Sequence, residues 1–401
     1  MQNMKFPWSD NWWIEDNKAW FCAGEIGALF CVDMESEECK LIARIPECNI
    51  YHFRQNSYCI KYENAIFCFP SMGDCVWYYN IKTTQWNKLV IGNTCQLFLC
   101  IESYKNGDPQ ICFWDIESKL YVVDLEKKIL KRKYQTLNEA KAEIGEYVLR
   151  RNKFYGVYSN KVVTVDLNQH DIRTIVISDV KADLYTICFD GTDFWLSGFG
   201  KEIYVWNSER GIIKVINDFP KGFGLNDFTE DQVLLVDTDS FFSDDSPFFL
   251  TSFLLGKYIW YIPFQANEII YINKETYGVF ALSIPDELET RESLMQNYMG
   301  SKFLMQYIRD DRYIGMYSFK NHRVFEIDSV ELTVTYRDYK LDHKSVLMIE
   351  KAAAGYHNGK ILNERREKDR KLFSRLLEEK NESSLDKYGH TGELIYHTLH
   401  K

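Results

Sequence analysis

The residues of this chain that could carry chemistry are scattered and form no linear catalytic signature. Asp115 and Glu117 are two carboxylates close together in sequence, the residue types that act as acid and base on a glycosidic bond. The sequence contains no GxSxG elbow, no HExxH pair and no glycine-rich phosphate loop. Nothing in the sequence fixes the separation of any two of its 58 acidic residues. We therefore assign no catalytic residue and prefer a non-enzyme, leaving activity open.

Metal-ligating residue types are present, but their spacing does not fit a metal site. Ten of the eleven cysteines lie between Cys22 and Cys112, and no two of them form a CxxC pair. We expect these cysteines to be free thiols that act as small buried hydrophobic residues. Four aspartates form an acidic stretch that does not match a twelve-residue calcium loop: Asp237, Asp239, Asp244 and Asp245. We expect neither a metal nor a cofactor.

The elements that must position any site form a repeat. Seven apolar strands each end on an acidic or amide residue, here called the anchor: Asp33, Asn80, Asp124, Asp166, Asn207, Asn273 and Asp328. Successive anchors are 47, 44, 42, 41, 66 and 55 residues apart, which is the length of one four-stranded blade where no loop is inserted. The sequence therefore predicts an all-β, seven-bladed β-propeller over residues 1–343, with four antiparallel strands per blade and an insertion at 217–246 between blades 5 and 6.

Strand chemistry supports this prediction. The runs are short, β-branched and aromatic, as in blade 2, where we expect strands at 57–62, 65–69, 75–80 and 85–90. A large ring stands twelve or thirteen residues before five anchors, and we expect it to pack between blades: Trp20, Phe67, Phe154, Trp195 and Trp260. The apolar run 247–264 is split by Gly256 and Lys257, so we expect two buried strands in place of a membrane span.

Two ways of closing the ring are compatible with the sequence. Blade 1 can close directly against blade 7, because seven complete sets of four strands fit between Asn11 and Lys340. Alternatively, the segment around Lys5 to Trp8 adds to the edge of blade 7, which would protect that edge from pairing with another chain.

Candidate binding residues lie on the loops expected at one face of the ring. The loops between second and third strands, and the connections between blades, gather there around the central channel, and loops on a rigid scaffold often carry function. We take as candidates His52, Arg54, Asp74, Asp115, Glu117, Lys201, Asn267 and His322.

The alternation of apolar and polar residues that marks the strands stops after Asp342, and residues 344–401 form a charged tail. We expect helices at 345–354 and 361–380, a break at 355–359 and a third apolar element from Thr391. The apolar stripes of the tail are Leu372, Phe373, Leu376, Leu377, Leu394 and Ile395. These stripes either fold back onto the propeller or dock on a partner protein or a second copy of the chain.

Charge is divided between the two parts. The tail has a net charge of +3 and the rest −13, within an overall −10. An acidic body repels phosphate, so we expect no nucleic-acid ligand. The sequence begins without a charged-then-apolar signal segment, and with its many cysteines this predicts a cytoplasmic protein without membrane insertion.

Two segments resemble known propellers. IYVWNSERGIIKVI from Ile203 resembles half a blade of kelch-like and quinoprotein-like seven-bladed propellers, and FDGTDFWLSGF from Phe189 resembles a turn of bacterial kelch-like propellers. The paired glycine of kelch blades, the closing Trp-Asp of WD repeats and sialidase Asp boxes are missing, so the resemblance implies the fold and no activity. The tail is similar to those of uncharacterised bacterial propellers from surface-polysaccharide gene clusters.

Two functional hypotheses follow. The first is a non-catalytic scaffold that binds a protein or peptide partner through its loop face and helical tail, with oligomerisation through the tail as a further possibility. The alternative is a carbohydrate-binding or carbohydrate-active propeller with its site at the channel mouth and tryptophans as stacking platforms.

Overall fold

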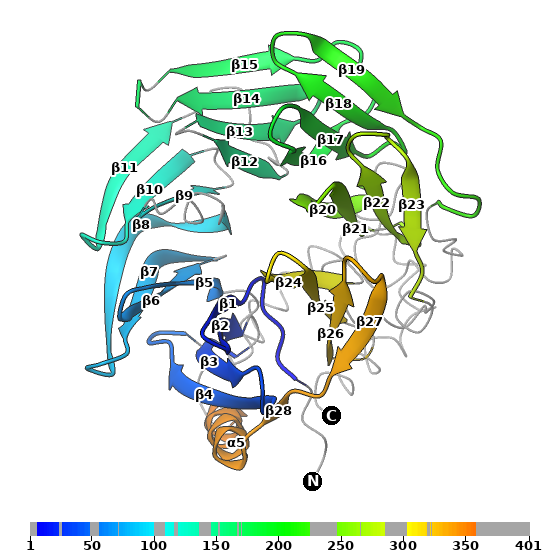
Figure 1. Cartoon of the computed structure of the whole chain (residues 1–401). Coiled ribbons are helices and arrows are strands. Elements are labelled where there is room, and N and C mark those ends of the chain that lie inside the picture. The colour runs from blue at the N-terminus through cyan, green and yellow to red at the C-terminus, as the bar shows by residue number, and fades with distance from the viewer. Residues whose placement is uncertain are drawn as a thin grey trace, which may run out of the picture. The chain divides into compact units, whose positions relative to one another are not determined.

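The computed structural model describes residues 6–23, 26–48, 56–70, 72–99, 109–115, 119–135, 146–150, 153–166, 168–169, 171–224, 247–264, 266–284, 303–318, 321 and 323–357. The chain divides into two compact units, Met1–Val346 and Leu347–Lys401. Within the first unit, antiparallel sheets form seven blades around a central axis (Figure 1). The predicted seven-bladed propeller is therefore confirmed.

Each blade is built from four strands that follow one another from the axis outward. Blades 1 to 3 contain β1 Trp13–Glu15, β2 Lys18–Ala23, β3 Ala28–Asp33, β4 Glu38–Arg44, β5 Asn56–Tyr62, β6 Ala65–Pro70, β7 Met72–Asn80, β8 Gln85–Leu99, β9 Gln110–Asp115, β10 Lys119–Asp124 and β11 Ile129–Gln135. Blades 4 to 7 contain β12 Tyr147–Arg150, β13 Lys153–Tyr158, β14 Lys161–Asp166, β15 Ile172–Val176, β16 Leu184–Phe189, β17 Phe194–Gly198, β18 Ile203–Asn207, β19 Gly211–Ile216, β20 Phe249–Leu255, β21 Tyr258–Pro263, β22 Ile269–Asn273, β23 Val279–Leu282, β24 Phe303–Arg309, β25 Tyr313–Ser318, β26 Arg323–Asp328 and β27 Thr333–Arg337.

Strand β8 is shared by two blades. Its residues 85–90 pair with β7, and residues 97–99 pair with β9, so blades 2 and 3 form one continuous seven-stranded sheet. The sequence predicted a strand ending at Val90. The strand instead continues through Gly92 and Asn93, residue types that usually mark turns, and it pairs with β7 again at Cys95 and Gln96.

The anchors form the turn between the third and fourth strands of each blade. Oδ1 of Asp33 accepts hydrogen bonds from the backbone N–H groups of Glu35 (3.1 Å) and Ser36 (2.9 Å). The other six anchors accept the same kind of bond, at 2.9–3.1 Å, from residues two or three positions later. Four residues after an anchor the backbone is left-handed, with φ from +55° to +75°, at Glu37, Thr84, Lys128, Gly211, Tyr277 and Leu332. The repeated acidic or amide ending is thus a turn-forming feature.

The predicted rings pack between blades, with one correction. Phe67, Trp195 and Trp260 are fully buried against the following blade, and half-buried Trp20 packs in the same way. Each of these four pairs with the residue two positions before its anchor, whereas Phe154 pairs with the residue immediately before its anchor. A shift of one residue turns a side chain to the other face of the sheet.

Phe154 therefore packs with Val122 of the preceding blade, and Tyr155 takes the equivalent position in blade 4. The Tyr155 ring centroid lies 4.6 Å from that of Phe194 in blade 5. The expected spacing identified the right segment of blade 4 but the wrong face of its strand.

The described cysteines are free thiols, and seven of these eight are buried, as expected for small core residues. Five share one cluster between blades 1 and 2: Cys22, Cys48, Cys59, Cys68 and Cys75. Burial raises the pKa of the Cys48 and Cys75 thiols to about 12, so they stay protonated at neutral pH.

The long apolar run is two core strands, as expected. β20 and β21 are joined by a turn in which Gly256 has a φ of +61°, and both strands are largely buried. In the part of the chain that the structure describes, no helix combines the length and apolar character needed to cross a bilayer.

Blades 1 and 7 each hold four consecutive strands, as the direct closure requires, and the sequence did not predict the short strand that is added to them. After blade 7, β28 Lys340–Leu341 pairs in parallel with Glu38–Cys39 and so covers the outer edge of blade 1. Residues 6–12 do not form an added strand on blade 7, although Trp12 N donates to Gln306 O at 2.7 Å and Tyr317 Oη donates to Phe6 O at 2.9 Å.

A buried ion cluster reinforces this closure. The Glu326 carboxylate, 2% exposed, accepts hydrogen bonds from Arg309 Nη2 (3.1 Å) and Arg337 Nε (2.7 Å). Arg337 Nη1 also donates to Glu37 Oε1 in blade 1 at 3.4 Å. The cluster therefore links the last blade to the first by charge-assisted bonds.

Helix α5 His343–His357 follows the ring. Asp342 caps it, because its Oδ1 accepts a hydrogen bond from Ser345 N at 2.6 Å. The expected end at Ala354 is wrong. The helix continues through Gly355, since a single glycine costs a helix only about 1 kcal/mol. The helices expected at 361–380 and from Thr391, and the acidic stretch 237–245, lie outside the described residues.

Candidate functional site

The structure describes four of the eight loop-face candidates. Lys201 and Asn267 lie in the loops between second and third strands of blades 5 and 6, as expected. Asp74 and Asp115 do not lie in loops. Asp74 is exposed and lies inside β7, at a bulge; β7 begins at Met72, so the predicted loop ends before Asp74. Asp115 is the last residue of β9. Outside the described residues lie His52, Arg54, Glu117 and His322, and the tail residues Leu372, Phe373, Leu376, Leu377, Leu394 and Ile395.

Lys201 and Asn267 converge on the first residues of the insertion. Lys201 Nζ donates to Phe223 O at 2.9 Å and lies 5.6 Å from the ring centroid of Phe219. Asn267 donates from Nδ2 to Gly222 O at 2.8 Å, and its Oδ1 accepts from Gly224 N at 3.0 Å. These contacts fix residues 219–224 on the loop face between blades 5 and 6.

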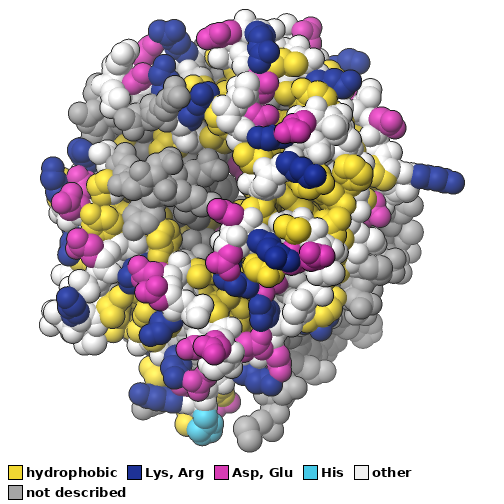
Figure 2. Space-filling view, in the orientation of Figure 1, with side chains coloured by type: hydrophobic (Ala, Val, Ile, Leu, Met, Phe, Trp, Pro, Cys, Tyr) yellow, Lys and Arg dark blue, Asp and Glu magenta, His cyan; other side chains and the backbone are white. Residues whose placement is uncertain are grey.

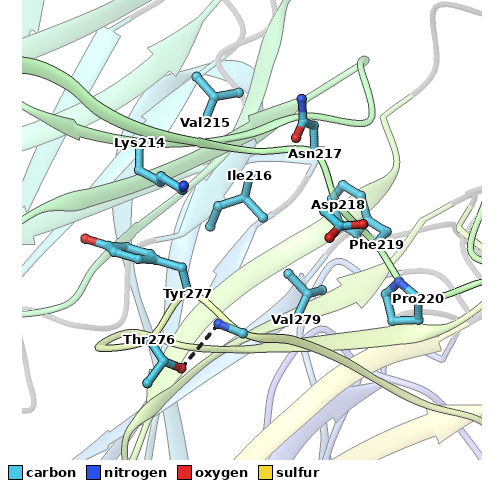
Figure 3. A pocket seen from close by; sticks show the side chains of 11 residues that line it. Lys214, Val215, Ile216, Asn217, Asp218, Phe219, Pro220, Thr276, Tyr277 and Val279 are labelled. Carbon is cyan, nitrogen blue, oxygen red and sulfur yellow. Dashed lines mark hydrogen bonds between the residues drawn. The ribbon is translucent and has the colours of Figure 1, made fainter.

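Phe219 and Pro220 of this segment help to line a groove at the outer rim of these two blades, here called the blade 5–6 groove. It has a volume of about 440 Å³ and is lined by residues 214–220 and by the blade 6 turn 276–279 (Figure 3). Ile216, Phe219 and Val279 contribute apolar side chains to a lining whose exposed surface is mostly polar, and Lys214 and Asp218 supply opposite charges.

Exposed apolar side chains lie beside the groove. Val215 on β19 is 38% exposed, and Phe280 on β23 is 45% exposed. Figure 2 shows hydrophobic side chains at the surface over blades 5 and 6. Among the described strands, β19 and β23 pair only with the strand on their inner side, so each leaves an edge of backbone N–H and C=O groups open.

A second polar cluster, around Glu146, joins the first strands of three blades. The Glu146 carboxyl accepts a hydrogen bond from the Thr251 hydroxyl at Oε1. Its Oε2 accepts from Ser252 N (3.0 Å), Ser252 Oγ (3.2 Å) and Ile187 N (3.3 Å). Burial raises the pKa of this carboxyl to about 8, although the hydrogen bonds oppose the rise.

Sequence reasoning missed Glu146. It is one of 58 acidic residues, and its partners are 41 to 106 residues away. The one available signal was its place directly before the first strand of blade 4, which could be recognised only after the strand boundaries were known.

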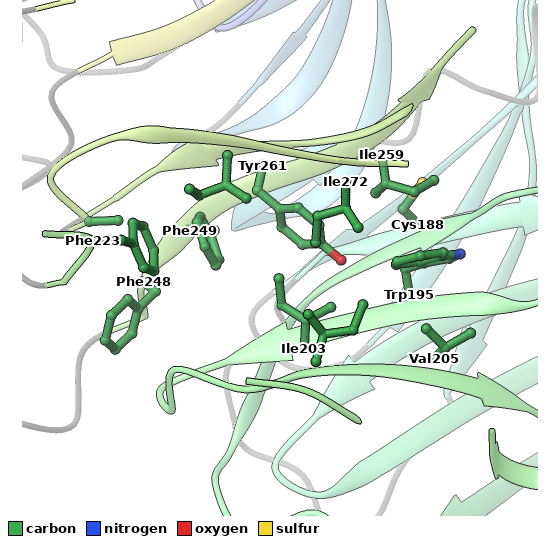
Figure 4. Packing of buried hydrophobic residues seen from close by; sticks show 13 residues of the cluster. Cys188, Trp195, Ile203, Val205, Phe223, Phe248, Phe249, Ile259, Tyr261 and Ile272 are labelled. Carbon is green, nitrogen blue, oxygen red and sulfur yellow. The ribbon is translucent and has the colours of Figure 1, made fainter. Parts of the chain in front are cut away.

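The core next to the Glu146 cluster is filled by apolar side chains. Trp195, Phe249 and Tyr261 pack with other apolar side chains of blades 5 and 6 (Figure 4). The buried Tyr261 hydroxyl has no hydrogen-bond partner among the described residues, and burial, the Cys188 thiol and Glu146 raise its pKa well above its ordinary value. Tyr261 therefore stays neutral.

The described tryptophans belong to the packing of the blades. Six are buried: Trp8, Trp12, Trp77, Trp195, Trp206 and Trp260. Three are half-buried: Trp13, Trp20 and Trp86.

Comparisons with known proteins agree on the fold. No protein-family model matches this chain, and no curated protein matches its sequence. The computationally designed Ika8 protein is 9% identical, with a TM-score of 0.51, over 83% of this chain and 87% of its own. A chain of the Mitotic Checkpoint Complex is 10% identical, with a TM-score of 0.53, over 84% and 89%. At these identities the likeness establishes the fold alone.

Proposed function

We propose that this chain is a non-catalytic β-propeller scaffold that binds a protein or peptide partner through its loop face and helical tail. The observation that carries the proposal is the blade 5–6 groove at the outer rim, with the exposed side chains of Val215 and Phe280 at its border. Exposed apolar groups that gather at one place mark interaction sites more often than isolated ones do.

The backbone at this rim suits an extended partner segment. The free edges of β19 and β23 offer main-chain hydrogen bonds, and the groove offers room for side chains of the partner. One similar solved structure belongs to a multi-protein assembly, the Mitotic Checkpoint Complex, which is consistent with a binding role.

This proposal is favoured over carbohydrate binding at the channel mouth. Six of the described tryptophans are buried in the packing of the blades, and the Glu146 carboxyl is engaged by three neighbouring residues, so these groups offer no free face to a sugar. Two further proposals rest on the sequence resemblance. One is that the chain is related to kelch-like or quinoprotein-like propellers, and the other is that its function is linked to surface polysaccharides. A cytoplasmic location is likewise a proposal, supported by the free thiols of the described cysteines.

A matched pair of substitutions tests the groove. Val215→Glu places a charge beside the groove, whereas Val176→Glu places it on the equivalent outer strand of blade 4, where Val176 is 57% exposed. Both variants of the full chain serve as bait in lysate of the native host, with retained proteins identified by mass spectrometry. We expect a partner that is held by the wild-type chain and by Val176→Glu but lost with Val215→Glu. A partner that all three retain would rule out the groove.

The tail is tested in the same assay. Alanine at Leu372, Phe373, Leu376 and Leu377 removes its predicted apolar stripe while keeping its length and charge. Loss of the partner with this variant would make the tail a docking element. Light scattering shows whether the stripe mediates oligomerisation instead. In that case the wild-type chain would have a multiple of the protomer mass, whereas the alanine variant would have the mass of one protomer.

A further inference from the structure

The outer strands of the seven blades differ at one equivalent position, the residue that pairs with the residue two positions before the anchor. A charged side chain on an edge strand hinders pairing with another chain. In blades 1, 3, 4 and 5 this residue is a lysine or an arginine, and in blades 2 and 7 it is polar. Blade 6 has an apolar residue there. In blade order the seven residues are Lys40, Asn87, Arg132, Arg173, Lys214, Phe280 and Thr335.

The outer strand of blade 6, β23, is uncharged along its whole length. Among the outer strands that the structure describes, it alone contains no Lys, Arg, Asp or Glu. It lies at the outer rim (Figure 1), and of the described strands it pairs only with β22. Its Phe280 side chain is 45% exposed. The edge of blade 6 therefore lacks the charge that protects other edges.

Phe280 ends a row of stacked rings that crosses blade 6. Trp260, Tyr271 and Phe280 are direct partners on β21, β22 and β23. The ring centroids of Trp260 and Tyr271 are 4.9 Å apart, and those of Tyr271 and Phe280 are 5.3 Å apart. Trp260 is fully buried, whereas Phe280 is exposed. An aromatic side chain on an added strand would extend this row by one cross-strand pair.

The backbone of β23 is oriented for such an addition. Asn273 N donates to Gly278 O at 3.0 Å, and hydrogen-bonded pairs alternate along an antiparallel ladder. Phe280 therefore directs its N–H and C=O toward β22, while those of Val279 and Ala281 point to the open edge. The fold already contains one added strand, because β28 pairs with the outer strand β4 of blade 1.

We propose that blade 6 binds its partner by strand addition: an extended, uncharged partner segment pairs with β23 as a fifth strand and places an aromatic side chain opposite Phe280. This inference rests on the proposed function, because Val279 both lines the blade 5–6 groove and begins β23, so one segment can occupy both.

Charge determines the composition of the segment. A lysine or arginine opposite Phe280 would meet no carboxylate on β23, and an acidic segment would be attracted to the lysines and arginines of the other edges. An uncharged segment with an aromatic residue is therefore complementary to blade 6 in particular.

A synthetic peptide of this composition tests the proposal. The probe is a fluorescein-labelled, amidated peptide of sequence TVTYTVT, and its binding to the full chain is followed by fluorescence anisotropy. Phe280→Lys gives β23 the charge of the other edges and should weaken binding by about tenfold or more. The control Val176→Lys places the same charge on β15 of blade 4, where Val176 is 57% exposed, and should bind as the wild-type chain does.

Two altered peptides separate backbone pairing from contacts of side chains. N-methyl groups on alternate residues keep the side chains but remove the donors of a strand, so this peptide should not bind. Lysine in place of the tyrosine should weaken binding. Strand addition would be overturned if the wild-type chain did not bind TVTYTVT, or if Phe280→Lys or the N-methylated peptide bound equally well. Should Phe280→Lys fail to fold, the two peptides still decide on the wild-type chain.

Other occupants of the edge would give different results. A dimer in light scattering that dissociates with Phe280→Lys would assign the edge to a second copy. Tighter peptide binding after alanine substitution of Leu394 and Ile395 would assign it to the tail. Either result would overturn the partner segment.

The bait assay separates this inference from the proposed function. A partner that is lost with Val215→Glu but kept with Phe280→Lys would refute strand addition and leave the groove as the binding surface. A partner that Val215→Glu retains would refute the groove itself.

Discussion

The anchor Asp328 allows the two roles of an anchor to be separated by experiment. Its Oδ1 accepts from Val330 N (2.9 Å) and Glu331 N (3.1 Å), which forms the turn, and its carboxylate also pairs with Arg312 at 2.5 Å. Asp328→Asn keeps the turn, because asparagine fills the same position at Asn80, Asn207 and Asn273. It removes only the ion pair, whereas Asp328→Ala removes both.

The size of the ion-pair effect follows from the pKa. The Arg312 hydrogen bonds, with smaller contributions from the turn N–H groups of Glu331 and Val330, lower the Asp328 pKa from 3.8 to about 2, so the part due to Arg312 is at most about 2.5 kcal/mol. The Arg312 side chain is 39% exposed, so solvent screening reduces this to about 1 kcal/mol. Losing the turn bonds adds about 1 kcal/mol for Asp328→Ala. For a ring of this size we expect Tm to fall by about 1 °C for Asp328→Asn and about 3 °C for Asp328→Ala at pH 7.

The pH dependence gives the sharper test. A lowered folded pKa means that the stabilisation is present above pH 4 and is lost as the pH falls toward 2. Thermal unfolding followed by circular dichroism at pH 7 and pH 3 should therefore show the Asp328→Asn deficit shrinking at pH 3. The control Asp33→Asn, at an anchor without a described ion pair, should lower Tm at pH 7 by less than Asp328→Asn does. Equal losses for Asp328→Asn and Asp328→Ala at pH 7, or a deficit that stays the same at pH 3, would refute this explanation.

Three further predictions concern the core and the closure. Gly315→Ala should lower Tm strongly, because its Cβ would lie 2.2–2.5 Å from Tyr307 ring atoms, whereas Gly256→Ala meets no atom within 4 Å and should cost only the strain of its φ of +61°. Similar Tm values for the two variants would contradict the described packing. Glu326→Gln should destabilise the ring by about 3 kcal/mol in urea unfolding, because Arg309 and Arg337 lose their shared carboxylate; a change below 1 kcal/mol would show that the cluster does not hold the closure. Cys48 and Cys75, with pKa values raised to about 12 by burial, should resist maleimide labelling of the native chain at pH 7 and react after unfolding, as peptide mapping will show; native labelling at either thiol would contradict their burial.

The sequence was most informative where a physical constraint repeats. Each blade needs the same turn, so an Asp or Asn recurs at its third-strand end, and the anchors predict both the number of blades and their boundaries. The ring at Phe154 was placed on the wrong face because spacing alone does not give the register, which differs by one residue in blade 4.

Features made by contacts between distant segments could not be predicted in this way. The closing strand β28 has only two residues, too few for a pattern, and it pairs with a strand some 300 residues earlier. Glu146 is defined by partners in two other blades. Of the predicted site, the sequence correctly placed Lys201 and Asn267 in loops of the same face, but their contacts with residues 219–224 depend on how the insertion folds back.

The central claim, that blades 5 and 6 carry a partner-binding surface, is tested most directly by a footprint of the bound partner. Hydrogen–deuterium exchange of the full chain is measured with and without the protein captured by the wild-type bait. The proposal predicts that the partner protects residues 211–220 and 276–282, which border the groove, and leaves the outer strand of blade 4 at 172–176 unchanged. Protection confined to other blades, with no change at residues 211–220 or 276–282, would contradict it.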